Sequence, residues 1–374
     1  MRISLTYILL SVSVLFGIPK FSIQNGSSCG LCHINPTGGA LRNDHGTEIV
    51  SMDELPRITD GSFYPNDYTG MINDHIRFGG DFRIQEFSYK PNDQYHDVRY
   101  HAFIPMQSEI YAFVTPSSAF GFFLEIDLNP NGSGSEYWGL INGLPMNGWL
   151  KFGRSLPNYG LRLDDHSSFI RNGSISQNYG LPTNQMPFSP FTQKPLLLEL
   201  GINPFRNILW TFSYGNGIYS SGNSGKHLLD KNMTTRMQYA GTLFNVQTLF
   251  ALQGMIESDR NLWGLSNRYC SGPITWESEL DWILNTDDYN LISLNVHHQL
   301  SLDIFTGISL NGTYEFIDPD LDTKSGSITR TAVGINYFPI PFLEIKFQTR
   351  FHQTENINIE KSEPEYIFQI HTWF

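Results

Sequence analysis

The sequence predicts an all-β fold, a transmembrane antiparallel β-barrel of about sixteen strands that follows a short N-terminal module. From residue 74 onward, segments alternate apolar or aromatic residues with polar ones, and a period of two places these sets on opposite faces of a strand. Short and long links between the segments alternate along the chain. The chain also ends in a segment of the same kind, whose last residue is Phe374.

The first 23 residues are predicted to be a secretory signal peptide. Arg2 precedes an apolar run from about Leu5 to Ile18, which Pro19 and Lys20 close. This run is too short to span a bilayer and is typical of the apolar part of a signal peptide. Cleavage is expected near residues 17–25, and a retained anchor helix is the alternative.

Composition excludes several classes of protein. The 374 residues carry a net charge of −12. An acidic chain argues against nucleic acid as a partner, because phosphate binding needs clustered Lys and Arg. Beyond the leader there is no long apolar segment, so a helical membrane protein is excluded. Three cysteines do not form the even framework of a disulfide scaffold.

The barrel itself is assigned to residues 74–374. The expected strands lie near 74–89, 99–114, 118–128, 135–141, 146–154, 194–203, 207–217, 233–242, 245–255, 260–270, 273–284, 290–299, 303–317, 326–338, 342–353 and 364–374. Links after even-numbered strands are short, such as "PSS", whereas most links after odd-numbered strands are longer, such as "KPNDQYHDV". Outer-membrane barrels show this asymmetry, with the short turns in the periplasm. Fourteen or eighteen strands, and a soluble β-sandwich, are the alternatives.

The last segment, "EYIFQIHTWF", alternates along its length and ends in an aromatic residue. It resembles the C-terminal recognition signal of outer-membrane barrel proteins. The alternative is a coincidental apolar C-terminus on a soluble β protein.

Residues 24–73 form a different kind of segment, rich in Gly, Asn, Asp and Pro. It contains "SSCGLCHINPTGGALRNDHG", in which Cys29, Cys32 and His33 make a Cys-x-x-Cys-His motif. Two thiols beside a histidine suit covalent haem attachment, with His33 as the proximal iron ligand. The alternatives are a redox dithiol and a zinc half-site. The first lacks a βαβ context and the second lacks a further pair of ligands. We therefore expect one covalent haem c.

The same stretch resembles a pattern, CxxCHxNPTGGGxRNxYG, of predicted outer-membrane cytochrome–porins. Ala40 replaces the third glycine, and His45 stands where the pattern has tyrosine. "WLKFGRSLPNYGLRLDDHSSFIRN", and "YEFIDPDLDTKSG" followed by "INYFPIPFLEIKFQTRF", also resemble that group. The layout is similar to that of cytochrome–porins that oxidise ferrous iron at the cell surface. The resemblance implies a porin fused to a monohaem cytochrome.

The longest link, residues 155–193, is expected to fold inward and narrow the lumen. An exposed loop with solvated ion pairs is the alternative. The residues expected at the constriction are Arg154, Arg162, Asp164, Asp165, His166 and Arg171. His45 and His166 are the first candidates for a distal haem ligand, ahead of Met52, His75, His96 and His101.

Three functions follow from this layout. The first is a porin-encased cytochrome that passes electrons across the outer membrane, between an extracellular donor or acceptor and a periplasmic cytochrome or other carrier. The second is a diffusion porin for small solutes with a haem-bearing plug. The third is a barrel that docks with a separate multihaem cytochrome. No catalytic triad or nucleotide loop is present, so electron transfer is expected rather than conventional enzyme activity, with an iron-oxidase-type activity left open.

Overall fold

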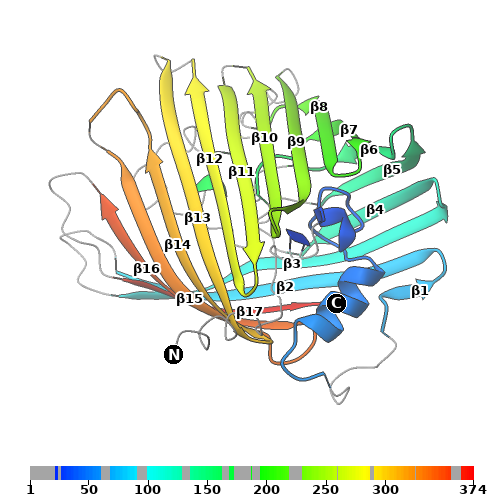
Figure 1. Ribbon diagram of the computed structural model, residues 1–374, viewed down its shortest axis with the longest axis horizontal. Coiled ribbons are helices and arrows are strands. Elements are labelled where there is room, and N and C mark those ends of the chain that lie inside the picture. Colours follow the sequence, from blue (N-terminus) through cyan, green and yellow to red (C-terminus); the bar gives the residue numbers. More distant parts are fainter. Residues whose placement is uncertain are drawn as a thin grey trace, which may run out of the picture.

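A closed antiparallel barrel forms most of the molecule (Figure 1). The structure is a computed structural model that describes residues 22–23, 27–59, 68–90, 99–128, 135–161, 168–171, 187, 194–218, 230–258, 260–286, 290–324, 326–354 and 364–374. Each long strand pairs with the next one along the chain. The last strand pairs with the first long strand, from Tyr366 opposite Ser88 to Trp373 opposite Asp81. Such closure satisfies every ladder position of a sheet that lies in lipid.

Sixteen long strands form the wall, which confirms the predicted antiparallel barrel and its strand number. They are β2 (Ile76–Tyr89), β3 (Tyr100–Ser117), β4 (Phe120–Asp127), β5 (Tyr137–Leu144), β6 (Gly148–Arg154), β7 (Leu196–Phe205), β8 (Ile208–Asn216), β9 (Lys231–Leu243), β10 (Val246–Glu257), β11 (Arg260–Ser271), β12 (Ile274–Asn285), β13 (Leu291–Phe305), β14 (Ile308–Asp318), β15 (Ile328–Tyr337), β16 (Leu343–Thr354) and β17 (Glu365–Trp373). A short strand, β1 (Met71–Asn73), pairs with the start of β2.

The predicted strand bounds are wrong at the hairpin between β13 and β14. A break was expected between residues 299 and 303, but β13 continues through it and the turn falls at 306–307. The alternation persists, because Ser301 and Asp303 are buried while Leu302 is exposed. The strand ends only where Gly307, with a φ of 79°, supplies the left-handed conformation of a turn.

Most strands place large apolar side chains on the outer face and polar ones inside, whereas β3 to β6 also direct aromatic side chains inward. On β8, Trp210, Phe212 and Tyr214 are exposed, whereas Thr211 and Ser213 between them are buried. An apolar outer face suits contact with lipid, and a polar inner face suits a water-filled or plugged lumen.

The two ends of the barrel differ in their connections. At one end, here the short-turn end, the links are residues 118–119, 145–147, 206–207, 244–245, 272–273, 306–307 and 338–342. The other end, the long-loop end, carries longer links such as 155–195 and 217–230, together with two short ones at 258–259 and 286–290. This is the predicted asymmetry, with two exceptions.

The core lies inside the barrel. Residues 27–59, here the N-terminal plug, contain the 3-10 helix η2 (Cys29–Leu31) and the helix η3 (His45–Glu54), which lies beside the C-terminus in Figure 1. Leu41 of the plug packs into an aromatic cluster of inward-facing side chains on β3 to β6, formed by Tyr111, Phe113, Phe123, Trp138, Leu140 and Trp149. The plug therefore occupies part of the lumen.

Ser22 and Ile23 fall within the predicted signal peptide, yet Ile23 is buried against the inward-facing side chains of Leu249 and Cys270. Among the described residues, no helix is both long enough and apolar enough to cross a membrane.

Candidate functional site

The Cys-x-x-Cys-His sequence forms a tight loop near the start of the plug. Helix η2 is a single turn, and the backbone N–H groups of Cys32 and His33 both donate to the carbonyl of Cys29, each at 3.2 Å. Cys29 is half-buried, Cys32 is buried, and both thiols are free. One turn of chain therefore presents two thiols and an imidazole.

Asn43 holds this loop in place. Its Nδ2 donates to the carbonyl of Leu31 at 2.9 Å and to that of Gly30 at 3.3 Å. Its backbone N–H donates to the Cys32 carbonyl at 3.0 Å, and its Oδ1 accepts from the Gly46 N–H at 3.0 Å. One residue thus ties the loop to the start of η3, which gives a physical reason for the asparagine in the motif.

The Asn-Pro-Thr-Gly-Gly stretch is a turn that Asn35 closes. Its Oδ1 accepts from the N–H and the hydroxyl of Thr37, at 3.2 and 3.0 Å. Gly38 has a φ of 87°, and a Cβ there would lie 2.6 Å from the Cys29 Cβ, so the turn rests directly on Cys29. Ala40 has a φ of 55°, a conformation that favours glycine, at the position where the resembling pattern has glycine.

Helix η3 approaches the loop closely and ties it to the last strand. A Cβ at Gly46 would lie 2.2 Å from the Cys32 carbonyl oxygen, so only glycine allows this approach. Further along, Ser51 Oγ accepts a hydrogen bond from Trp373 Nε1 at 2.9 Å. The Arg42 guanidinium lies 4.9 Å from the centroid of the Trp373 ring.

Two further contacts fix the plug at the short-turn end. The Arg57 N–H donates to the carbonyl of Phe338, in the β15–β16 turn, at 2.8 Å. Arg77 of β2 forms an ion pair with Asp44. The plug is therefore held by the first long strand, by a turn and by the last strand.

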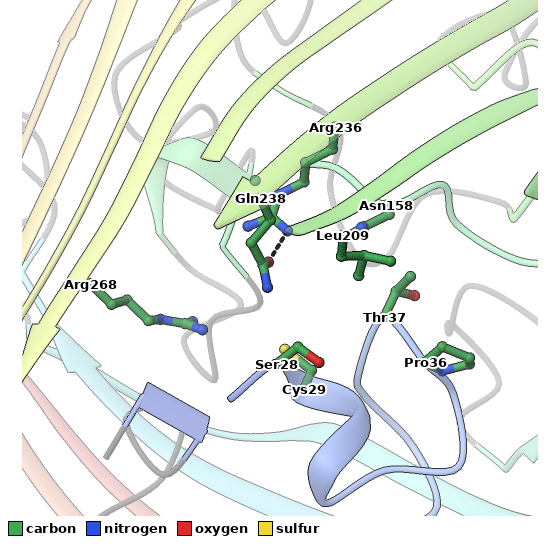
Figure 2. A pocket seen from close by; sticks show the side chains of 10 residues that line it. Ser28, Cys29, Pro36, Thr37, Asn158, Leu209, Arg236, Gln238 and Arg268 are labelled. Carbon is green, nitrogen blue, oxygen red and sulfur yellow. Dashed lines mark hydrogen bonds between the residues drawn. The ribbon is translucent and has the colours of Figure 1, made fainter. Parts of the chain in front are cut away.

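Cys29 faces a cavity between the plug and the wall, with its sulfur directed into that space (Figure 2). The cavity is lined by Ser28, Cys29, Pro36, Thr37, Asn158, Gly160, Leu209, Arg236, Gln238 and Arg268. The last four come from β8, β9 and β11. A group bonded to the Cys29 sulfur would therefore lie inside the barrel.

Cys32 borders an apolar cluster on another side of the loop, formed with Val50, Leu55, Phe338 and Trp373. Burial, with a smaller contribution from the neighbouring Cys29, raises the pKa of the Cys32 thiol to about 11. The thiol is therefore protonated at neutral pH. This argues against a redox dithiol, because the thiolate is the reactive form.

The donor set fits a covalently bound haem. Thioether attachment needs two free thiols and axial ligation needs an imidazole, which Cys29, Cys32 and His33 supply. Cys29 and Cys32 would hold the porphyrin, and His33 would ligate its iron. Within the described part of the chain, no cluster of three or more His, Cys, Asp or Glu side chains could hold a bare metal ion.

Of the two candidate distal ligands, only His45 lies in a described segment. His45 is the first residue of η3, and its Nε2 is buried and makes no hydrogen bond. Burial raises the pKa of the nearby Glu54 carboxyl, and His45 partly offsets this rise. His166 lies outside the described residues.

The β6–β7 link enters the lumen where the structure describes it. The Asn158 N–H donates to Glu199 Oε2 at 2.7 Å, and the Phe169 N–H donates to Glu315 Oε1 at 2.9 Å. Both carboxylates belong to inward-facing side chains, on β7 and β14. The wall therefore holds residues 155–161 and 168–171 by their backbone and also by side chains, such as the Tyr159 hydroxyl that donates to Asp281 Oδ1 at 2.7 Å.

Two of the residues expected at a constriction lie in described segments. Arg171, in the short helix η4 (Phe169–Arg171), is buried and pairs with Glu279 of β12 at 2.9 Å while donating to the Leu161 carbonyl at 3.1 Å. Arg154 at the end of β6 donates to the Lys194 carbonyl at 3.0 Å. Both guanidiniums hold the link to the wall. Arg162, Asp164 and Asp165 lie, like His166, outside the described residues.

Sequence reasoning does not single out the wall residues that hold the link or line the Cys29 cavity. Glu199, Glu279 and Glu315 hold the link, and Arg236 and Arg268 line the cavity. Each is a charged residue at an inward-facing position of an alternating strand, and that position is the only signal the sequence contains. Which segment each residue contacts depends on the closed barrel.

Comparison with solved structures shows the type of barrel. The chain is similar to OprB of Pseudomonas putida, with a TM-score of 0.58 and 10% identity over 80% of this chain and 94% of that one. It is similar to OmpT of Vibrio cholerae (TM-score 0.56, 10% identity, 81% and 99% covered) and to an anion-selective porin from Comamonas acidovorans (TM-score 0.54, 12% identity, 80% and 99% covered). No family model and no curated protein matches the sequence. The fold is that of the sixteen-stranded porins.

Proposed function

We propose that the chain is an outer-membrane protein whose barrel encloses a c-type haem and passes electrons across that membrane. The fold supports the location, because the outer face is apolar and similar barrels are outer-membrane proteins. Lipid of the outer membrane would surround the wall.

The observation that carries the electron-transfer function is the position of Cys29 inside the barrel. The apolar band of an outer membrane is about 25 Å tall. A cofactor outside the lumen would leave that distance unbridged, whereas a cofactor at the Cys29 cavity would shorten the path of an electron through the membrane.

The chain's own residues hold and shield the group. Haem, when bound, supplies a one-electron iron couple. Cys29 and Cys32 would hold the group covalently and His33 would ligate its iron, while Asn43 keeps their loop in shape. The apolar cluster beside Cys32 excludes water from that side.

Each end of the barrel would meet a different partner. The plug lies at the short-turn end, where a periplasmic cytochrome or another carrier would exchange electrons with it. The long-loop end would meet an extracellular donor or acceptor. The family resemblance suggests ferrous iron as one such donor.

Haem content tests this proposal. Detergent-purified protein, expressed with a cytochrome c maturation system, should show one covalent haem per chain by pyridine haemochrome analysis. The haem should be lost in a Cys29→Ala, Cys32→Ala variant. A folded, heat-modifiable barrel without haem would contradict electron transfer.

A diffusion porin with an N-terminal plug is the second candidate, and the comparisons support it more directly than the first. The similar structures include an outer-membrane channel of Acinetobacter baumannii and an anion-selective porin. In this case ions pass through the lumen, and the conductance of the barrel in a planar bilayer should be the same in the wild type and in a His33→Ala variant.

A further inference from the structure

Two carboxyl groups lie side by side where the wall holds the β6–β7 link. They belong to Glu279 and Asp281, inward-facing residues of β12 whose side chains are fully buried. A hydrogen bond joins the two side chains. Two carboxylates can only accept, so a hydrogen bond between two carboxyl groups needs a proton on one of them. The pair therefore holds one proton.

The contacts of the pair show that Asp281 carries this proton. Glu279 accepts from the Arg171 guanidinium at both oxygens, at 3.1 and 2.9 Å, as a carboxylate does. Asp281 Oδ1 accepts from the Tyr159 hydroxyl at 2.7 Å, whereas its Oδ2 is buried and has no other hydrogen-bond partner in the described part of the chain. A proton on Oδ2, donated to Glu279, satisfies this oxygen and leaves Glu279 charged.

The strands on one side of β12 bring no charge into contact with the pair. Gln253 of β10 places its amide 3.4 Å from Asp281, and the residue opposite Asp281 on β11 is Gly264. Arg236 of β9 donates to Gln238 and, at 3.5 Å, to Ser266. Nothing on this side compensates a second negative charge.

The strand on the other side is β13, where His297 lies opposite Glu279. Its Nδ1 contacts Glu315 at 3.4 Å rather than the pair. Among the described residues, Arg171 is thus the single cation that pairs with either carboxyl group. If Asp281 ionised, two buried carboxylates would share one counter-charge, which is strongly unfavourable in a site closed to water.

The link itself closes the site to water. The Tyr159 hydroxyl, the Leu161 N–H and the Arg171 guanidinium all donate to the pair. A Cβ at Gly160 would lie 2.2 Å from Glu279 Oε1, so the backbone of the link lies directly against these carboxyl groups. Displacing the link would let water solvate both charges. The held link therefore favours the protonated pair, and the proton favours the held link.

We propose that Asp281 is a proton-binding site that controls the β6–β7 link: its proton keeps the link inside the lumen, and loss of the proton releases the link and widens the lumen. By the sign of this linkage the link is held at low pH and released as the pH rises. The inference goes beyond the proposed function and does not depend on haem, because every group it uses belongs to the wall or the link.

The test compares Asp281→Asn with the matched control Glu365→Gln. Asparagine has the shape of aspartic acid, and its amide can donate to Glu279 while its oxygen accepts from Tyr159, so it mimics the protonated acid at every pH. Glu365 is a buried residue of β17 whose carboxylate pairs with His352, and its loss removes a lumenal carboxylate away from the link. Heat-modifiable mobility in electrophoresis checks that each barrel has folded.

Hydrogen exchange of residues 155–161 is measured from about pH 6 to about pH 10, with each rate divided by that of an unstructured peptide at the same pH. Protection in the wild type and in Glu365→Gln should fall at least tenfold as the pH rises. Protection in Asp281→Asn should not fall. In the Cys29→Ala, Cys32→Ala background, which removes the titrating thiols of the plug, ion conductance in a planar bilayer should rise with the same midpoint unless Asp281→Asn is also present.

Two further variants keep the test decisive if Asp281→Asn does not fold. Tyr159→Phe removes the hydroxyl that donates to Asp281 and stabilises its ionised form, so the midpoint should move to higher pH. His297→Gln removes the imidazole opposite Glu279 and should leave the midpoint unchanged. Constant protection in the wild type, an equal fall in Asp281→Asn, or a midpoint that follows His297 instead of Tyr159 would overturn the proton site, whether or not the chain carries haem.

Discussion

Ala40 has a backbone conformation that is unfavourable for a residue with a side chain. Its φ of 55° is left-handed, where a non-glycine residue is destabilised by about 1–2 kcal/mol. We expect Ala40→Gly to stabilise the docked plug by about 1 kcal/mol, after the greater freedom of glycine in the unfolded chain is subtracted. Hydrogen exchange of the plug amides should slow about fivefold.

Gly39→Ala is the paired variant. Gly39 has a φ of 85°, so a side chain there introduces the strain that Ala40→Gly removes, and exchange should become faster. Equal exchange rates in wild type and Ala40→Gly would show that the left-handed backbone at residue 40 carries no strain.

Cys32 makes the haem-free plug sensitive to alkaline pH. Its pKa is raised from 9.0 to about 11, so the docked plug binds this proton more tightly than the unfolded plug does. The stability of the plug is therefore complete below about pH 9 and falls as the pH rises toward 11. The full loss is about 3 kcal/mol, at roughly 1.4 kcal/mol per pH unit.

Alkylation measures this pKa. In haem-free Cys29→Ser, Cys270→Ser protein, the rate of Cys32 alkylation by iodoacetamide should follow a thiolate that forms well above pH 9. The matched Cys32→Ser, Cys270→Ser protein reports Cys29, which is half-buried and faces the cavity, and it should react faster at pH 8. A Cys32 midpoint at the ordinary value of a thiol would contradict its burial.

At the scale of elements, η3 and β17 are joined by Trp373. Trp373→Phe keeps an aromatic ring but removes the N–H that donates to Ser51 and weakens the contact with Arg42. The two losses together come to roughly 1.5 kcal/mol, so exchange of the η3 amides should rise about tenfold. Trp282→Phe, on the outer face of β12, is the matched control and should leave η3 unchanged.

The β6–β7 link is joined to the wall by Glu279. Glu279→Gln preserves the shape of the side chain but leaves the buried Arg171 without its counter-charge, a change that destabilises by roughly 3–5 kcal/mol. The Leu161 N–H, which donates to Glu279, should lose protection from hydrogen exchange at least a hundredfold. Glu344→Gln on β16, whose carboxylate contacts His371, should not change it. Unchanged protection in Glu279→Gln would mean that other contacts hold the link.

The strands could be predicted from sequence because their signals are local. Alternation marks both faces of β8, and the turn at Phe244 and Asn245, both with positive φ, is only two residues long. The β13–β14 hairpin was misplaced because its alternation continues past the expected break, and only Gly307 marks the turn.

The candidate site could be predicted only in part. Cys29, Cys32 and His33 are adjacent in sequence, so their chemistry can be read directly. The contact of Ser51 with Trp373 joins residues 322 positions apart, and that of Leu161 with Glu279 joins residues 118 positions apart. Such contacts exist only once the barrel has closed, so no sequence pattern predicts where the plug lies or which wall residues surround the Cys29 cavity.

At the scale of the whole molecule, a barrel of porin fold contains a segment whose motif is typical of a cytochrome. The plug contacts β2, the β15–β16 turn and β17, and the β6–β7 link contacts β7, β12 and β14. The wall thus serves as the scaffold for both. The plug and the link therefore fill part of the lumen.

Electron transfer across a sealed bilayer decides between a cytochrome and a plain channel. Liposomes that enclose oxidised cytochrome c would carry either the haem-loaded wild type or His33→Ala, and a reductant coupled to a large polymer would be added outside. We predict that the enclosed cytochrome c is reduced through the wild type and that reduction is abolished, or slowed at least tenfold, with His33→Ala. Equal rates with both proteins, or no reduction through a wild type that carries its haem, would contradict transmembrane electron transfer.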